Sequence, residues 1–113
     1  MGRILAILAL GMVVSCGGGV TRGGDPVARF ASVSGPIKSA CLSSGRRAAN
    51  PQICGCIQAA ADQTLSGADQ RRGASFFGNP ELAHAVRASD TERDDAFWDR
   101  WRNFGSAADQ LCS

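Results

Sequence analysis

The stretch ICGCI places two cysteines, Cys54 and Cys56, one residue apart, and this spacing limits what the chain can fold into. On an α-helix, residues two apart point about 200° away from each other. The two sulfur atoms therefore face different neighbours rather than each other. Gly55, between them, leaves room for a second segment of backbone to approach the helix closely. Two separate bridges to distant cysteines, Cys41 and Cys112, are the simplest expectation.

Metal binding and thiol exchange explain this pair less well. Structural zinc sites use Cys-x-x-Cys or similar loops, and the only histidine, His84, would have to join from far away in the sequence. A redox pair is normally Cys-x-x-Cys. A Cys-x-Cys exchange pair would leave Cys41 and Cys112 without a role. We therefore expect no metal site and no cofactor, and we expect His84 to be a surface or half-buried structural residue.

The amino-terminal stretch MGRILAILALGMVVSC has the layout of a secretory signal. Arg3 supplies positive charge, residues 4–14 form an apolar run of eleven residues, and the small Ser15 precedes Cys16. Eleven apolar residues are too few to span a bilayer as a stable helix. The sequence VVSC at the end of the run resembles the bacterial lipobox. That resemblance implies that Cys16 receives a diacylglycerol and becomes the first mature residue. Secretion without a lipid is the alternative.

Residues 16–33 follow as the lipidated cysteine and a glycine-rich tether, GGGVTRGGDP being its core. We expect residues 1–15 to be a signal peptide and residues 34–113 to be the folded domain. The lipoprotein resemblance also implies a location. Gly17 is not an aspartate, which by the sorting rule of some bacteria directs a lipoprotein to the outer membrane, facing the periplasm. A soluble periplasmic or secreted protein is the alternative.

The cysteine count agrees with export. There are five cysteines, and lipidation of Cys16 leaves four: Cys41, Cys54, Cys56 and Cys112. An even number in an oxidising compartment predicts two disulfides. A folded domain of about 80 residues has a small core and often needs such cross-links.

Sequence signals for helix starts recur along the domain. No run of strand length alternates apolar and polar residues. Pro36, Asn50–Pro51, Ser66–Asp69 and Asn79–Pro80 are all typical of helix starts. Gly67 is a plausible stop for the second helix. The sequence predicts an all-α bundle of four or five short helices within residues 34–113, with the segments 35–51, 50–67, 66–79, 79–89 and 90–112 as the helical stretches.

The last segment is the most strongly periodic. It carries an aromatic stripe at steps of four, three, four and three: Phe97, Trp101, Phe104, Ala108 and Leu111. This spacing places the stripe on one helix face, which we expect to be core. Trp98 falls off the stripe.

Pairing of the four cysteines can be narrowed. The helices joined by the SGRRAANP turn should run antiparallel. Cys41 lies several residues before the turn, and Cys56 lies further beyond the turn than Cys54 does, so Cys56 is slightly better placed opposite Cys41. We therefore favour Cys41–Cys56 with Cys54–Cys112. A rotation of the second helix would give Cys41–Cys54 with Cys56–Cys112 instead. Both versions predict that Cys54 and Cys56 are not bonded to each other.

The sequence constrains the function of the protein less than its fold. The segment ACLSSGRRAANPQICGCIQAAADQTLSGADQRR, with DDAFWDRWRNFG and the final cysteine, resembles a group of small exported bacterial proteins without an established activity. Some members carry an automatically assigned arginine-transporter label. The sequence shows no phosphate loop, metal spacing or hydrolase elbow, so we expect no catalytic residue and no enzyme activity. A net charge of +2 gives no reason to expect nucleic-acid binding.

Two hypotheses follow. The first is a membrane-anchored periplasmic lipoprotein with a structural or interaction role and an envelope protein as partner. The second is a small-ligand or transport-accessory protein, in which aromatic faces and carboxylates would hold a cationic solute such as arginine. The candidate residues for that site are Trp98, Trp101, Asp95 and Asp99. Two arginine pairs, 46–47 and 71–72, are solvated surface or, as the alternative, anion contacts.

Overall fold

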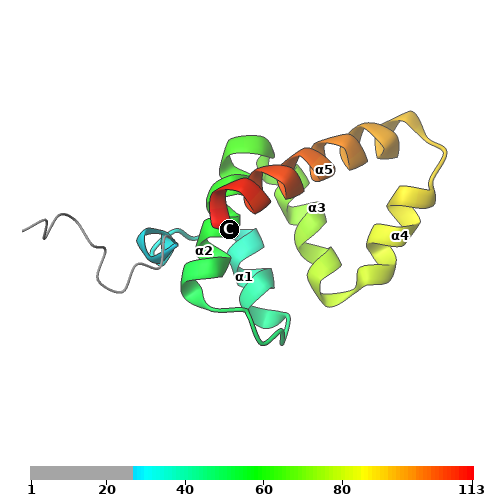
Figure 1. Ribbon diagram of the computed structural model, residues 1–113. Helices are drawn as coiled ribbons and strands as arrows, with labels where there is room; N and C mark the ends of the chain where they lie inside the picture. Colours follow the sequence, from blue (N-terminus) through cyan, green and yellow to red (C-terminus); the bar gives the residue numbers. More distant parts are fainter. Residues whose placement is uncertain (1–26) are drawn as a thin grey trace, which may run out of the picture.

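The computed structural model describes residues 27–113, and every regular element in this part is helical (Figure 1). The signal peptide, Cys16 and most of the predicted tether lie outside the described residues. The expectation of an all-α domain with two disulfides is confirmed. The elements are η1 (Ala28–Phe30), α1 (Pro36–Ser43), α2 (Pro51–Thr64), α3 (Gly67–Gly78), α4 (Pro80–Ala88) and α5 (Glu92–Cys112).

Most helix starts follow the sequence signals. Asn50 caps α2 by accepting a hydrogen bond from the backbone N–H of Ile53 at 2.8 Å. Ser66 caps α3 and Thr91 caps α5 in the same way. Two details differ from expectation. Gly67 begins α3 rather than ending α2, because Leu65 already leaves the helix in an extended conformation with its side chain buried. The side chain of Asn79 does not cap α4.

The start of α1 is capped from another helix. Gly35, before Pro36, has no side chain to offer, and Oε1 of Gln58 accepts a hydrogen bond from the backbone N–H of Lys38 at 2.9 Å. The amide of Gln58 is fully buried and donates to Asp62 and to Gln70, each at 2.8 Å. Every polar atom of this buried amide therefore has a partner, which removes the penalty of burying it.

The disulfides join Cys41 to Cys54 and Cys56 to Cys112. The favoured pairing of Cys41 with Cys56 was therefore wrong, and the alternative pairing is the one observed. The claim shared by both versions, that Cys54 and Cys56 are not bonded to each other, is confirmed. The first bridge closes the α1–α2 hairpin, and the second ties the end of α5 to α2.

The alignment of α2 against α1 explains why Cys41 is bonded to Cys54 rather than to Cys56. Gln58 lies one helical turn after Cys54 and so shares its face. Because Gln58 meets Lys38 near the start of α1, Cys54 is placed opposite Cys41 near the end of α1. The two contacts show that α1 and α2 run antiparallel. Cys56 then points to the side on which α5 packs.

Between the two cysteines, Gly55 faces η1. A Cβ atom at Gly55 would overlap the carbonyl oxygen of Phe30. The close backbone approach expected at this glycine is therefore present, and η1 packs against α2. Packing begins before residue 34, within the segment predicted to be tether, since Val27 is also buried.

The core has two parts, which lie towards opposite ends of α5. Figure 1 shows α1 and α2 near the C-terminal end of α5 and α4 near its N-terminal end. The first cluster joins α1, α2, α3 and the C-terminal half of α5: Ile37, Ala60, Ala61, Leu65 and Phe104 are its buried residues. The second joins α3, α4 and the N-terminal half of α5 through Phe76, Val86 and Phe97. Trp101 packs against both clusters. The aromatic stripe therefore faces the core as predicted, with Trp101 half-buried and Trp98 half-buried against the second cluster.

Gly73 explains how the Trp101 ring fits between the clusters. A Cβ atom at position 73 would overlap the six-membered part of the indole. The ring also contacts Phe76 edge-on at 5.2 Å and Phe104 at 4.8 Å between centroids, so it has little freedom to move aside. Glycine in the middle of α3, costly for helix propensity, is required by this contact.

We predict that Gly73→Ala destabilises the protein by about 1–3 kcal/mol, the usual cost of overpacking. The control is Gly105→Ala in α5, where a Cβ atom would meet no neighbour within 4 Å. That change should stabilise the protein by up to about 1 kcal/mol through helix propensity alone. Urea unfolding of both variants measures the difference. Equal effects at the two positions would show that the indole does not press on α3.

Candidate functional site

The residues predicted to bind a cationic ligand line no common cleft among those described below. Asp95 and Asp99 are exposed on α5. Trp98 is half-buried against the second cluster, and Trp101 lies between the two clusters. Of the four, Trp101 alone lines one of the three clefts described below. The structure therefore brings no carboxylate of residues 95 or 99 to an aromatic cleft.

A cleft of about 350 Å³ lies between α3, α4 and the start of α5; we call it the α4 cleft. Its lining consists of Arg72, Ser75, Phe76, Leu82, Ala85, Val86, Ser89 and Asp94. The two charged residues in this wall neutralise each other, since Nη2 of Arg72 donates to Oδ1 of Asp94 at 2.6 Å. The exposed side chain of Leu82 lies at its edge.

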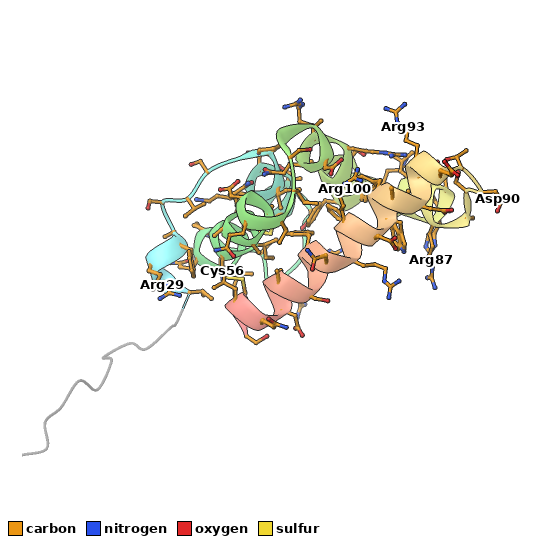
Figure 2. The ribbon with its side chains drawn as sticks, turned by 90° about the horizontal axis from the view of Figure 1, so that it is seen from above. Arg29, Cys56, Arg87, Asp90, Arg93 and Arg100 are labelled. Carbon is orange, nitrogen blue, oxygen red and sulfur yellow. A yellow bond between two sulfur atoms is a disulfide. The ribbon has the colours of Figure 1, made fainter. Side chains whose placement is uncertain are left out.

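Two arginines secure α5 to α3 around a buried ring. The guanidinium of Arg72 lies 4.5 Å from the centroid of Phe97, and that of Arg100 lies 6.0 Å from it. Arg100 also makes a two-pronged ion pair with Asp69 of α3, at 2.6 and 3.1 Å, from the middle of α5 (Figure 2). Exposed ion pairs contribute little on their own. Here each guanidinium also covers an aromatic face, which adds a cation–π contact.

These ion pairs alter the titration of their members. The hydrogen bond from Arg72, followed by that from Ser89, lowers the pKa of Asp94 below its ordinary value. The hydrogen bond to Asp69 raises the pKa of Arg100. Both shifts favour the charged forms, so the two pairs are intact at neutral pH.

Two further clefts adjoin each other at Arg46 and Phe77. The Trp101 cleft, of about 260 Å³, is lined by Arg46, Phe76, Phe77, Pro80, Ala83 and Trp101. The loop cleft, of about 150 Å³, is lined by Cys41, Ser44, Arg46, Ala48, Ala49, Ile53, Ile57 and Phe77. Arg46 is the one charged residue in both linings. We call the two clefts together the Arg46 groove.

The backbone that carries Arg46 is held on both sides. Gly45 has a φ of +73°, a left-handed conformation that ends α1 and that favours glycine. The N–H of Arg46 donates to Oγ of Ser44 at 3.4 Å, and the carbonyl of Arg46 accepts from the N–H of Ala49 at 3.0 Å. The Cys41–Cys54 bridge closes the loop that contains them.

Other site types have no support in the described residues. Residues 27–113 contain no group of three histidine, cysteine, aspartate or glutamate side chains placed to hold a metal ion. His84 lies exposed on α4, as expected. None of the helices described is both long enough and apolar enough to cross a membrane.

Comparisons with protein-family models, with curated proteins and with solved structures give no match to this chain. The resemblance to a group of exported proteins therefore stays a prediction from the sequence. Any function has to be argued from the residues and their geometry.

The pair at the α4 cleft predicts a pH dependence. Because the folded-state pKa of Asp94 is lowered, its stabilising effect is present above the unfolded-state pKa and is lost as the pH falls through the folded-state value. We expect Asp94→Asn to melt at a lower temperature than the wild type near neutral pH. The two melting temperatures should converge as the pH falls below about 4. Thermal unfolding followed by circular dichroism measures both.

Asp95→Asn is the matched control, because the Asp95 carboxylate takes part in none of the hydrogen bonds or ion pairs described for residues 27–113. Asp94 and Asp95 both lie in the first turn of α5, near the positive end of the helix dipole, so the melting temperature of Asp95→Asn should fall less than that of Asp94→Asn near neutral pH. A difference between Asp94→Asn and the wild type that does not change with pH would contradict the assignment to the ion pair.

Proposed function

We propose that this protein is a lipoprotein, attached to the outer membrane through a lipid on Cys16, that presents a disulfide-linked helical domain to the periplasm for interaction with an envelope protein. The observation that carries the proposal is the use of the cysteines. Two disulfides account for four of the five cysteines. The fifth is Cys16, which follows the apolar run and Ser15 and completes the VVSC motif.

Burial of the bridges supports an oxidising compartment. Cys41, Cys54 and Cys56 are at most 5% exposed, so both disulfides are built into the packing of α2. Disulfides of this kind form and persist in exported proteins and are rare in the reducing cytosol. The folded domain and the signal-like leader thus point to the same compartment.

The arrangement of the domain supports an interaction role. Figure 2 shows Arg29 of η1 at one end of the domain, while Arg87, Asp90 and Arg93 lie at the other end, around the α4–α5 connection. A lipid anchor on the chain before η1 would attach the domain at its η1 end. The α4–α5 end would then be the one further from the anchor and open to a partner. Catalysis forms no part of the proposal.

The transport-accessory hypothesis for arginine receives less support from the geometry. Its site requires carboxylates beside aromatic rings, but the cleft that contains Trp101 has Arg46 as its charged residue. A guanidinium ligand would be repelled there by the like charge.

The anchor predicts a mass and a location. Protein extracted from membranes should begin at Cys16 and carry acyl chains, as measured by intact-mass spectrometry. Cys16→Ser should abolish the added mass and release the protein from the membrane fraction or leave its leader uncleaved. Ser15→Ala is the matched control, because it keeps a small residue before the cysteine and should be acylated normally. Recovery of unmodified wild-type protein cleaved at another position would refute the anchor.

The interaction role has its own test. Chemical crosslinking on intact cells should give a defined adduct with the wild type and with Ser15→Ala, and the adduct should decrease when Cys16→Ser removes the domain from the membrane. If acylation is found but the wild type gives no adduct above background, the anchor stands and the interaction role does not.

A further inference from the structure

We infer that the Arg46 groove is a binding site for a small amphiphilic carboxylate, whose charged group pairs with the Arg46 guanidinium while its apolar body lies along the aromatic and aliphatic walls. The site belongs to the folded domain. It depends neither on acylation of Cys16 nor on an envelope partner.

The walls of the groove are apolar on both sides of the arginine. Phe77 contributes to both clefts, Trp101 and Pro80 extend the wall towards α4, and Ile53 and Ile57 extend it along α2. Neither cleft alone reaches the lower end, about 300 Å³, of ordinary small-molecule pockets. A ligand that spans both clefts past Arg46 would cover an elongated apolar surface.

The charge of the groove selects an anion. Arg46 is exposed, and its guanidinium takes part in none of the hydrogen bonds or ion pairs described for residues 27–113. By contrast, Arg72 and Arg100 are already paired with Asp94 and Asp69. No acidic residue lines either cleft. A guanidinium beside apolar walls can bind a carboxylate through two parallel hydrogen bonds.

The backbone that carries Arg46 is held in place before a ligand arrives. The loop that carries it is fixed by the left-handed Gly45, by two backbone hydrogen bonds and by the bridge between Cys41 and Cys54. Such preorganisation reduces the ordering cost of binding. Arg47, the next residue, is exposed as well but lines neither cleft. The pair therefore offers two exposed arginines of the same charge, of which Arg46 alone lines the groove.

Decanoate is a suitable probe, measured by isothermal titration calorimetry below its micelle-forming concentration. The protein is the full chain with Cys16→Ser, which keeps predicted acyl chains from occupying the groove. We expect saturable binding of decanoate, and weaker binding of decan-1-ol and decyltrimethylammonium. Arg46→Gln should weaken decanoate binding by at least about tenfold, the loss expected for a hydrogen bond to a charged group. Arg47→Gln removes the same charge and should leave the affinity unchanged.

A second pair of variants tests the walls. Ala48 is exposed and lines the loop cleft, so Ala48→Trp should block decanoate binding. Ala85 is exposed and lines the α4 cleft, so Ala85→Trp is the control and should bind normally. Circular dichroism melting of all four variants checks that they fold. Equal losses for Arg46→Gln and Arg47→Gln, decan-1-ol binding as tightly as decanoate, or no saturable binding of decanoate to the folded protein would each overturn the inference.

Discussion

Three consecutive residues of α2 hold the domain together, because each faces a different neighbour. Cys54 is bonded to Cys41 of α1, Gly55 admits the backbone of η1, and Cys56 is bonded to Cys112 at the end of α5. The bridges span sequence separations of 13 and 56 residues. In the chain-entropy description such loops stabilise the fold by about 3 and about 4 kcal/mol. For a domain whose larger core cluster contains five buried residues, this contribution is comparable with the whole net stability of a small protein.

Away from α2 the packing depends on Trp101. It is the residue that joins the two clusters, and glycine at position 73 lets its ring approach α3. Beyond it, α4 lies apart from α1 and α2 (Figure 1). It contributes one buried side chain, Val86, to the second cluster. With few buried apolar contacts and no bridge, α4 should open locally at a lower free energy than α2. Both the α4 cleft and the Trp101 cleft take part of their lining from this helix, whereas the loop cleft takes none.

Local signals in the sequence predicted most of the fold and little of the site. Caps at Asn50 and Ser66 and the spacing of the aromatic stripe depend on neighbours in sequence, and these expectations were confirmed. The disulfide register depends on how α2 is rotated, which Gln58 fixes through its contact with Lys38, twenty residues away in the chain. A polar residue one turn after Cys54 was the available signal, but its partner could not be read from spacing. The four residues predicted to form an aromatic–acid site line no common cleft within residues 27–113, since Asp95 and Asp99 are exposed on α5 and Trp101 alone lines a cleft.

The arginine pairs 46–47 and 71–72 look alike in sequence, yet the fold uses them differently. Arg72 is paired with Asp94 and lies over the ring of Phe97, so its charge already takes part in contacts that link α3 to α5. Arg46 extends from a loop closed by the Cys41–Cys54 bridge, and the same bridge supplies part of the wall of the groove that Arg46 lines. The disulfide is thus one of the contacts that hold the backbone of the groove. The compartment proposed for the domain from its cysteines is therefore also the compartment in which this contact forms.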